Sequence, residues 1–187
     1  MKCICSVSMD HGHDGSCSHH TTVPSVHQTL DELDFYKGLL GAAADGDYKK
    51  TESLLQKGND PNQQDSYGYT PLHYSCRQGQ ARVTELLLRH GAQTDLQTKG
   101  GATALHRASY QGHLECVKHL LDKGADCTIV DSDGKTALHK AAENGHEEVC
   151  RVLVKKSAGL LTVQDTHGRT ALDCALSKHP HLSEVLR

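Results

Sequence analysis

The pattern of polar and apolar positions in residues 65–97 predicts a turn followed by a short helix. Residues 65–68, with the sequence Asp-Ser-Tyr-Gly, have the composition of a turn. Thr70 occupies the position of a helix N-cap, and Pro71 follows at the first helical position, where its missing N–H costs nothing. Gly79 suits the left-handed conformation that ends many helices, so the predicted helix stops there.

A second helix is predicted directly afterwards, over about residues 81–89. Val83, Leu86 and Leu87 recur at helical spacing and form one apolar stripe. Residues 65–97 therefore form a unit of a turn, a short helix, a longer antiparallel helix and an extended return.

This unit recurs along the chain with a fixed period. The segments that begin at Thr70, Thr103 and Thr136 read Thr-Pro-Leu-His or Thr-Ala-Leu-His, and a fourth, at Thr170, ends in Asp173 instead of His. A constant spacing of this length indicates one supersecondary unit stacked several times, with function on a continuous surface. We expect units at about 32–64, 65–97, 98–130, 131–164 and 165–187, of which the first and last are caps.

The chain divides into a tail and a repeat domain. Residues 1–28 have no helical or strand periodicity and are predicted to be flexible, which leaves 29–187 as the repeat domain. The sequence Thr-Leu-Asp-Glu at 29–32 predicts a capping box. We expect a helix to follow it and to end near residues 45–47.

Small side chains recur at one position of the first helix in successive units. Residues 75–76 are Ser-Cys, residues 108–109 are Ala-Ser and residues 141–142 are Ala-Ala. Because small side chains let helices approach closely, we expect these pairs at the interfaces between units.

The repeated motif resembles the ankyrin repeat. It reads Asp-x-x-Gly-x-Thr-Pro-Leu-His, then Gly-His, then Leu-Leu-Leu-x-x-Gly-Ala-Asp, with its best copies at 101–124 and 134–157. The resemblance covers about 32–187 and implies an all-α repeat solenoid of stacked helix-turn-helix units with β-hairpin fingers. The departures from the motif are residues 36–39 in place of Thr-Pro-Leu-His, Gln80 in place of a His, Thr98 in place of the leading Asp, and Asp173 in place of the last His.

The resemblance also gives the repeated histidines a structural role. It implies that His73, His106 and His139 each hydrogen-bond to the Thr three residues earlier and brace the turn. With one such His in each unit, successive copies are expected to lie too far apart to share a metal ion. His113 and His146, which follow Gly in the turn between helices, are interpreted in the same way.

Composition and charge exclude several classes of function. The chain has 187 residues, one Phe, no Trp and a formal net charge of −3, so it lacks the basic surface of a nucleic-acid-binding protein. No apolar run reaches the ~18 residues of a membrane span, and the N-terminus has no apolar segment typical of a signal peptide. We therefore expect an intracellular, cytoplasmic or nuclear monomer with neither a nucleic-acid nor a membrane partner. The cysteines inside the repeats are expected to be small buried thiols.

Cysteine and histidine are concentrated in the predicted tail. Both are ligands for zinc or copper, although their spacing is tighter than that of the usual structural zinc sites. Two interpretations stay open, a disordered polar tail and a metal site, and a metal-responsive regulator is the alternative function. The candidate ligands are Cys3, Cys5, His11, His13, Cys17, His19 and His20.

The sequence contains no catalytic motif. It has no Gly-x-Ser-x-Gly, no Gly-rich phosphate loop and no His-Glu-x-x-His, which favours a non-catalytic protein without a cofactor. The resemblance implies an adaptor, scaffold or stoichiometric inhibitor that binds a protein partner through a concave face.

Positions that vary between units while the framework repeats are the candidates for partner binding. Tyr67, Tyr69, Arg77 and Tyr110 are of the residue types that dominate binding energy in interfaces, so the second and third units are predicted to hold the centre of affinity. The candidates are Ser66, Tyr67, Tyr69, Arg77, Gln78, Lys99, Ala102, Tyr110, Gln111, Ser132, Asp133, Lys135, Glu143, Asn144, His167 and Arg169.

Overall fold

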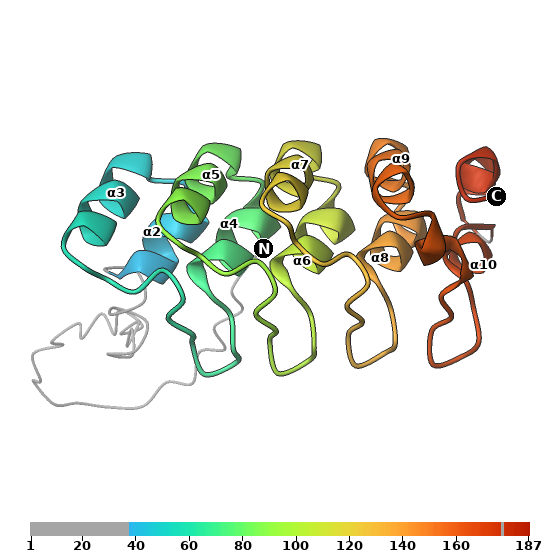
Figure 1. Ribbon diagram of the computed structural model, residues 1–187, viewed down its shortest axis with the longest axis horizontal. Helices are drawn as coiled ribbons and strands as arrows, with labels where there is room; N and C mark the ends of the chain where they lie inside the picture. The colour runs from blue at the N-terminus through green and yellow to red at the C-terminus, as the bar shows by residue number, and fades with distance from the viewer. Residues whose placement is uncertain (1–37, 177) are drawn as a thin grey trace, which may run out of the picture.

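Two parallel rows of helices form an elongated array in the computed structural model, which describes residues 38–176 and 178–187 (Figure 1). The inner row contains α2 (Leu39–Asp45), α4 (Pro71–Gln78), α6 (Ala104–Gln111), α8 (Ala137–Glu143) and α10 (Ala171–Leu176). The outer row contains α3 (Tyr48–Gln56), α5 (Ala81–Arg89), α7 (Leu114–Asp122) and α9 (Glu147–Lys156). Two 3₁₀ helices complete the C-terminal end, η1 (Ala158–Thr162) and η2 (Pro180–Glu184).

The predicted class, an all-helical repeat solenoid, is confirmed. Each inner helix from α2 to α8 packs against the next inner helix and against the outer helix that follows it, and α10 packs against η2. The capping box predicted at residues 29–32 and the tail at 1–28 lie outside the described residues. The helix expected after that capping box is described from Leu39 onward.

The ends of α4 follow from local sequence signals. The Thr70 hydroxyl accepts a hydrogen bond from the His73 amide at 3.3 Å, and Pro71 occupies the first helical position. Gly79 ends the helix with φ +74°, a conformation that a side chain disfavours. The second predicted helix, 81–89, is present as α5.

The core is one continuous layer of leucines and small residues that runs the length of the array. Leu72, Leu105 and Leu138 occupy the same position in successive repeats, and each is at most 1% exposed. The small pairs at 75–76, 108–109 and 141–142 are all fully buried, as predicted. Because each unit buries only a thin apolar layer against its neighbours, no large central core is needed.

The fingers between units are loops that all project to one side of the array (Figure 1). No strand is assigned within residues 38–176 and 178–187, so the expected β-hairpins are present there as tight loops. The Asp131 amide donates to the Lys135 carbonyl at 3.0 Å and closes one loop. The Ser132 amide donates to the Gly100 carbonyl, also at 3.0 Å, and joins that loop to the preceding one.

A histidine brace connects each inner helix to the next repeat. Nδ1 of His73 accepts the Thr70 amide at 3.2 Å and lies 2.8 Å from the Thr70 hydroxyl, which confirms the predicted Thr–His pair. Because the amide can only donate, Nδ1 carries no proton, and Nε2–H therefore donates to the Ala102 carbonyl at 3.1 Å. This second bond reaches into the following repeat and was not predicted.

The same brace repeats at His106 and His139. Their Nδ1 atoms lie 2.9 Å from the preceding Thr hydroxyl, and their Nε2 atoms donate to the carbonyls of Lys135 and Arg169 at 3.0 and 3.2 Å. Asp173 replaces the histidine in the last repeat. Its carboxylate accepts the Thr170 amide at 2.9 Å but has no donor for a following repeat, which suits a cap.

Burial keeps these imidazoles neutral. Desolvation lowers the pKa of His73 to about 4, and it lowers the pKa of His106 and of His139 as well. A proton on Nδ1 would face the threonine amide, so protonation also breaks the cap.

We predict that acid destabilises the array between about pH 6.5 and pH 4. The unfolded chain takes up these protons first as pH falls, so stability is complete above the unfolded pKa and is lost below it. His73 alone contributes a loss of about 2 kcal/mol between pH 7.5 and pH 5. Urea unfolding at the two pH values measures the loss. Equal stability of the wild type at the two pH values, or an equally large loss in His73→Gln, would contradict the assignment of His73 as a buried neutral imidazole.

A second contact between repeats places a histidine directly against a glycine. Gly112 has φ +77°, and a Cβ built there would lie 2.4 Å from Nδ1 of His146 in the next repeat. Nε2 of His146 lies 3.0 Å from the Tyr110 carbonyl. The structural role predicted for His146 is confirmed, and its close approach requires Gly at position 112.

We predict that Gly112→Ala is more destabilising than Gly124→Ala. Gly124 has φ +85° but has no atom within 4 Å of a built Cβ, so Ala there carries only the backbone cost of about 1–2 kcal/mol. At Gly112 the displaced His146 adds an overpacking cost of roughly 1–3 kcal/mol. Thermal and urea unfolding of both variants measures the difference, and equal losses would refute the contact.

Candidate functional site

The candidate site is the surface formed by the finger loops and the exposed side of α4, α6, α8 and α10, which we call the finger face. The fingers precede these helices in the chain and stand beside one another along the array (Figure 1). Since the buried framework is the same in each unit, the finger face differs between units only where exposed residues of the helices and loops differ.

Most of the predicted partner-binding residues are accessible on this face. Tyr67 is 69% exposed at a finger tip, and Tyr110 is 48% exposed at the end of α6. Half-buried positions are Tyr69, Lys135, Glu143 and Asn144. The other exposed ones are Ser66, Arg77, Gln78, Lys99, Gln111, Ser132, Asp133, His167 and Arg169.

Two of the predicted residues have a structural role. Ala102 is 6% exposed, so its side chain offers little surface to a partner, and its carbonyl accepts the His73 hydrogen bond. The Tyr69 ring packs edge-on against His73, with centroids 5.7 Å apart, and lies 5.4 Å from Tyr74. Tyr69 therefore supports the surface more than it forms it.

The residue four positions after Thr70, Thr103 and Thr136 also reaches the finger face and was missed in the sequence. These residues are Tyr74, Arg107 and Lys140, whereas Cys174, four positions after Thr170, is buried at 6% exposure. The sequence contained a signal for them, since they differ in every repeat just as the finger tips do. In addition, the helical period places position 74 on the same side of α4 as Arg77, which indicates that it faces the same surface.

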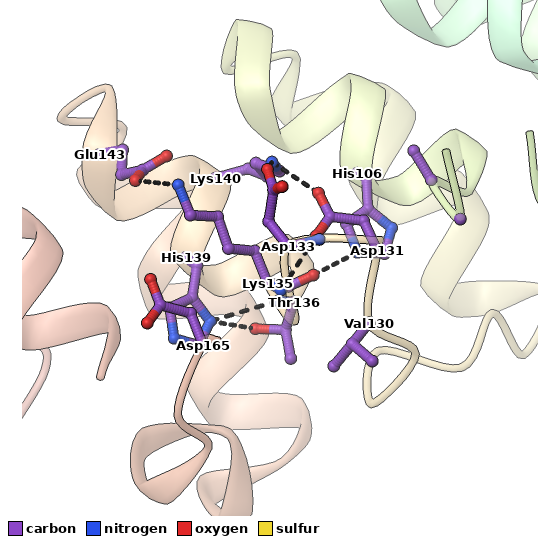
Figure 2. A network of polar contacts seen from close by, with 12 residues as sticks. His106, Val130, Asp131, Asp133, Lys135, Thr136, His139, Lys140, Glu143 and Asp165 are labelled. Atoms are coloured by element: carbon purple, nitrogen blue, oxygen red, sulfur yellow. Dashed lines mark hydrogen bonds and ion pairs between the residues drawn. The ribbon is translucent and has the colours of Figure 1, made fainter. Parts of the chain in front are cut away.

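An ion pair links the finger to the helix in the fourth repeat (Figure 2). The Lys140 ammonium lies 2.6 Å from Oδ2 of Asp131, and the two side chains are 17% and 6% exposed. Oδ1 of Asp131 accepts the amides of Asp133 and Lys135, both at 3.0 Å. Burial raises the pKa of Asp131, but Lys140 and the two amides outweigh that effect and lower it.

A second ion pair joins Lys135 to Glu143 on the same face. Burial lowers the pKa of Lys135, but the hydrogen bond and the charge of Glu143 raise it above its ordinary value. Lys135 and Glu143, both predicted contacts, are thus already paired with each other.

The third repeat lacks the carboxylate that its neighbours use. Asp65 accepts the Tyr74 hydroxyl at 2.7 Å, as Asp131 accepts Lys140. Thr98 stands at this position in the third repeat, and its hydroxyl accepts the amide of Ala102 at 3.2 Å. Within residues 38–176 and 178–187, Arg107 therefore has no carboxylate to face.

A hollow of about 390 Å³ lies on the finger face beside Arg107. Tyr110 and Lys140 line it from α6 and α8, and Ser132 and Asp133 line it from a finger. The hollow is within the size range of ligand sites, although it is mostly polar.

No metal site is found in the described part of the chain. No group of three or more His, Cys, Asp or Glu side chains in 38–176 and 178–187 is placed to hold an ion. The seven candidate ligands of the tail, Cys3 to His20, lie outside these residues. None of the described helices is long and apolar enough to cross a membrane.

The five cysteines of the repeats are buried free thiols, as predicted. Burial raises the pKa of Cys150 to about 12 and also raises that of Cys127 and of Cys174. All five side chains pack as small apolar groups, and Cys127, Cys150 and Cys174 form little thiolate.

A family model of ankyrin repeats (three copies) matches residues 39–131 and 124–187. The chain belongs to the ankyrin repeat family. Two curated relatives, both called ankyrin repeat domain-containing protein 39, come from Bos taurus and Homo sapiens. They are 52% and 51% identical to the chain over 63 residues, which is 34% of this chain and 34% of each relative. The match thus spans about a third of the curated relatives' length.

We predict that Asp131→Asn destabilises this ankyrin array by about 1–3 kcal/mol, because Asn keeps the turn bonds but leaves the half-buried Lys140 without a counter-charge. The matched control is Glu85→Gln, which removes an exposed pair with Arg89 and should cost under ~1 kcal/mol. Urea unfolding compares the two variants. A loss for Asp131→Asn no greater than that of the control would show that the Lys140 pair does not stabilise the fold.

Proposed function

We propose that the protein is a non-catalytic interaction module that binds a protein partner on the finger face. The observation that carries the proposal is the division of residues within each repeat. The histidines, threonines and small residues are buried and bonded within the array, whereas the positions that differ between repeats are mostly exposed on one face. Ankyrin repeat proteins generally mediate protein–protein interaction, which agrees with this division.

Two exposed tyrosines support a centre of affinity in the second and third repeats. Tyr67 and Tyr110 are among the large apolar side chains exposed in the described part of the chain. Tyrosine contributes large contact area at low entropic cost and is enriched where interfaces hold most of their energy. We further propose that the protein is monomeric and intracellular. The free thiols of the repeats agree with an intracellular location.

We predict that Tyr67→Ser/Tyr110→Ser weakens partner binding at least about tenfold and leaves the unfolding midpoint nearly unchanged. Tyr69 is left intact because it packs against His73. Proximity labelling in cells identifies partners, and titration of a purified partner gives the dissociation constant.

The control for this experiment is Arg89→Ser/Lys118→Ser, which removes two exposed charges on outer helices α5 and α7. Partners that bind the finger face should be kept by the control and lost by the tyrosine variant. Partners lost equally from both variants, or from neither, would contradict the proposal.

A further inference from the structure

Arg107 differs from Lys135, Lys140 and Arg169 of the finger face in having no counter-charge. No carboxylate in residues 38–176 or 178–187 pairs with it, and its hydrogen bond runs sideways to the Tyr69 hydroxyl. Its Nε is buried and has no hydrogen-bond partner. A buried donor without a partner is costly, and a cationic one more so.

The cause lies in one finger residue. In the second and fourth repeats, Asp65 and Asp131 place a carboxylate oxygen against the residue of the same repeat that corresponds to Arg107. In the last repeat, Asp165 pairs instead with Arg169, at 2.8 Å. Thr98 has no carboxylate, so in the third repeat the helix presents a cation and the finger presents no anion.

Tyr69 holds the guanidinium in a defined position. The Arg107 carbon Cζ lies 5.0 Å from the centre of the Tyr69 ring, and Nη2 donates to the Tyr69 hydroxyl. Stacking on an aromatic ring orients the planar group and leaves the Nη1 donors, rather than the buried Nε, for a ligand.

We propose that Arg107 is the anchor for a single Asp or Glu side chain of a partner protein, which the hollow on the finger face receives. A carboxylate is the planar acceptor that matches a guanidinium. This inference rests on the proposed function and names the chemistry of the partner segment.

The surroundings of Arg107 define that segment further. Tyr110 lines the hollow and is exposed, so an apolar partner residue adjacent to the acid has an aromatic surface to cover. Lys140 is neutralised by Asp131, and Asp133 adds an exposed negative charge at the tip of the finger. A run of acidic residues would be repelled by Asp133, so one acid flanked by neutral and apolar residues fits the site.

The position of Thr98 supplies a sharp test. Thr98→Asp should give Arg107 the internal partner that its neighbours have, whereas Thr98→Asn has the same shape without the charge. Arg107→Gln removes the guanidinium itself. The probe is a linear peptide selected from a random display library on the full-length protein, with its affinity measured by fluorescence polarisation.

We expect the selected peptides to share one Asp or Glu next to an apolar residue. Arg107→Gln and Thr98→Asp should each weaken their binding about tenfold, and Thr98→Asn should not. Replacing the peptide's acid by its amide should weaken binding to the wild type by a similar factor and should have little further effect on Arg107→Gln. Thermal unfolding confirms that every variant is folded, and Thr98→Asp should be at least as stable as Thr98→Asn.

Each of the following results would overturn the inference. The first concerns peptides whose affinity falls with Tyr67→Ser/Tyr110→Ser. If these peptides share no acid, or if they bind Arg107→Gln as tightly as the wild type, the proposed function stands and the role of Arg107 is refuted. Equal affinities of the peptides for Thr98→Asp and Thr98→Asn would likewise refute the role of Arg107 and leave the proposed function standing. Self-association of the wild type that Arg107→Gln abolishes would assign the site to a second copy of this chain. Peptides that bind independently of the two tyrosines and of Arg107 would instead contradict the proposed function as well.

Discussion

The structure depends on one neutral imidazole in each internal repeat. Nδ1 of His73 completes the cap of its own helix, while Nε2 holds the first residues of the next finger through the Ala102 carbonyl. In a repeat array each unit contacts only its neighbours, so this bond helps to fix the position of one repeat relative to the next. Both bonds require a neutral ring with its proton on Nε2: the low pKa of the buried ring keeps it neutral, and the Thr70 amide fixes the tautomer.

The repeated framework leaves the finger face free to differ in sequence from one repeat to the next. Because the braces and small residues satisfy the fold internally, the fingers and the position four residues after each threonine can change without loss of the array. The contrast between Asp131 with Lys140 and Thr98 with Arg107 illustrates this freedom. The same backbone presents a neutralised pair in one repeat and an uncompensated cation in its neighbour.

Much of the local structure could be predicted because it depends on residues close in the chain. Thr70, Pro71 and Gly79 determine the ends of α4 through contacts within three or four residues. The exposed candidates Tyr67 and Tyr110 were identified by their variation against a constant framework. Ala102 was included for the same reason, yet it is buried, because sequence variation does not distinguish an exposed side chain from one that a neighbouring repeat covers.

The sequence alone determined the repeat period and the helix pairs, which follow from local capping signals and from a periodic apolar pattern. The threonine–histidine caps and the capping character of Asp173 were implied by the resemblance of that pattern to the ankyrin repeat. The tertiary structure decided which groups are paired across repeats: the bond from His73 to a carbonyl 29 residues away, the contact of Gly112 with His146, and the stacking of Arg107 on Tyr69. Such pairings depend on distances between side chains of different units, which the stacking of the helices establishes and the linear order does not specify.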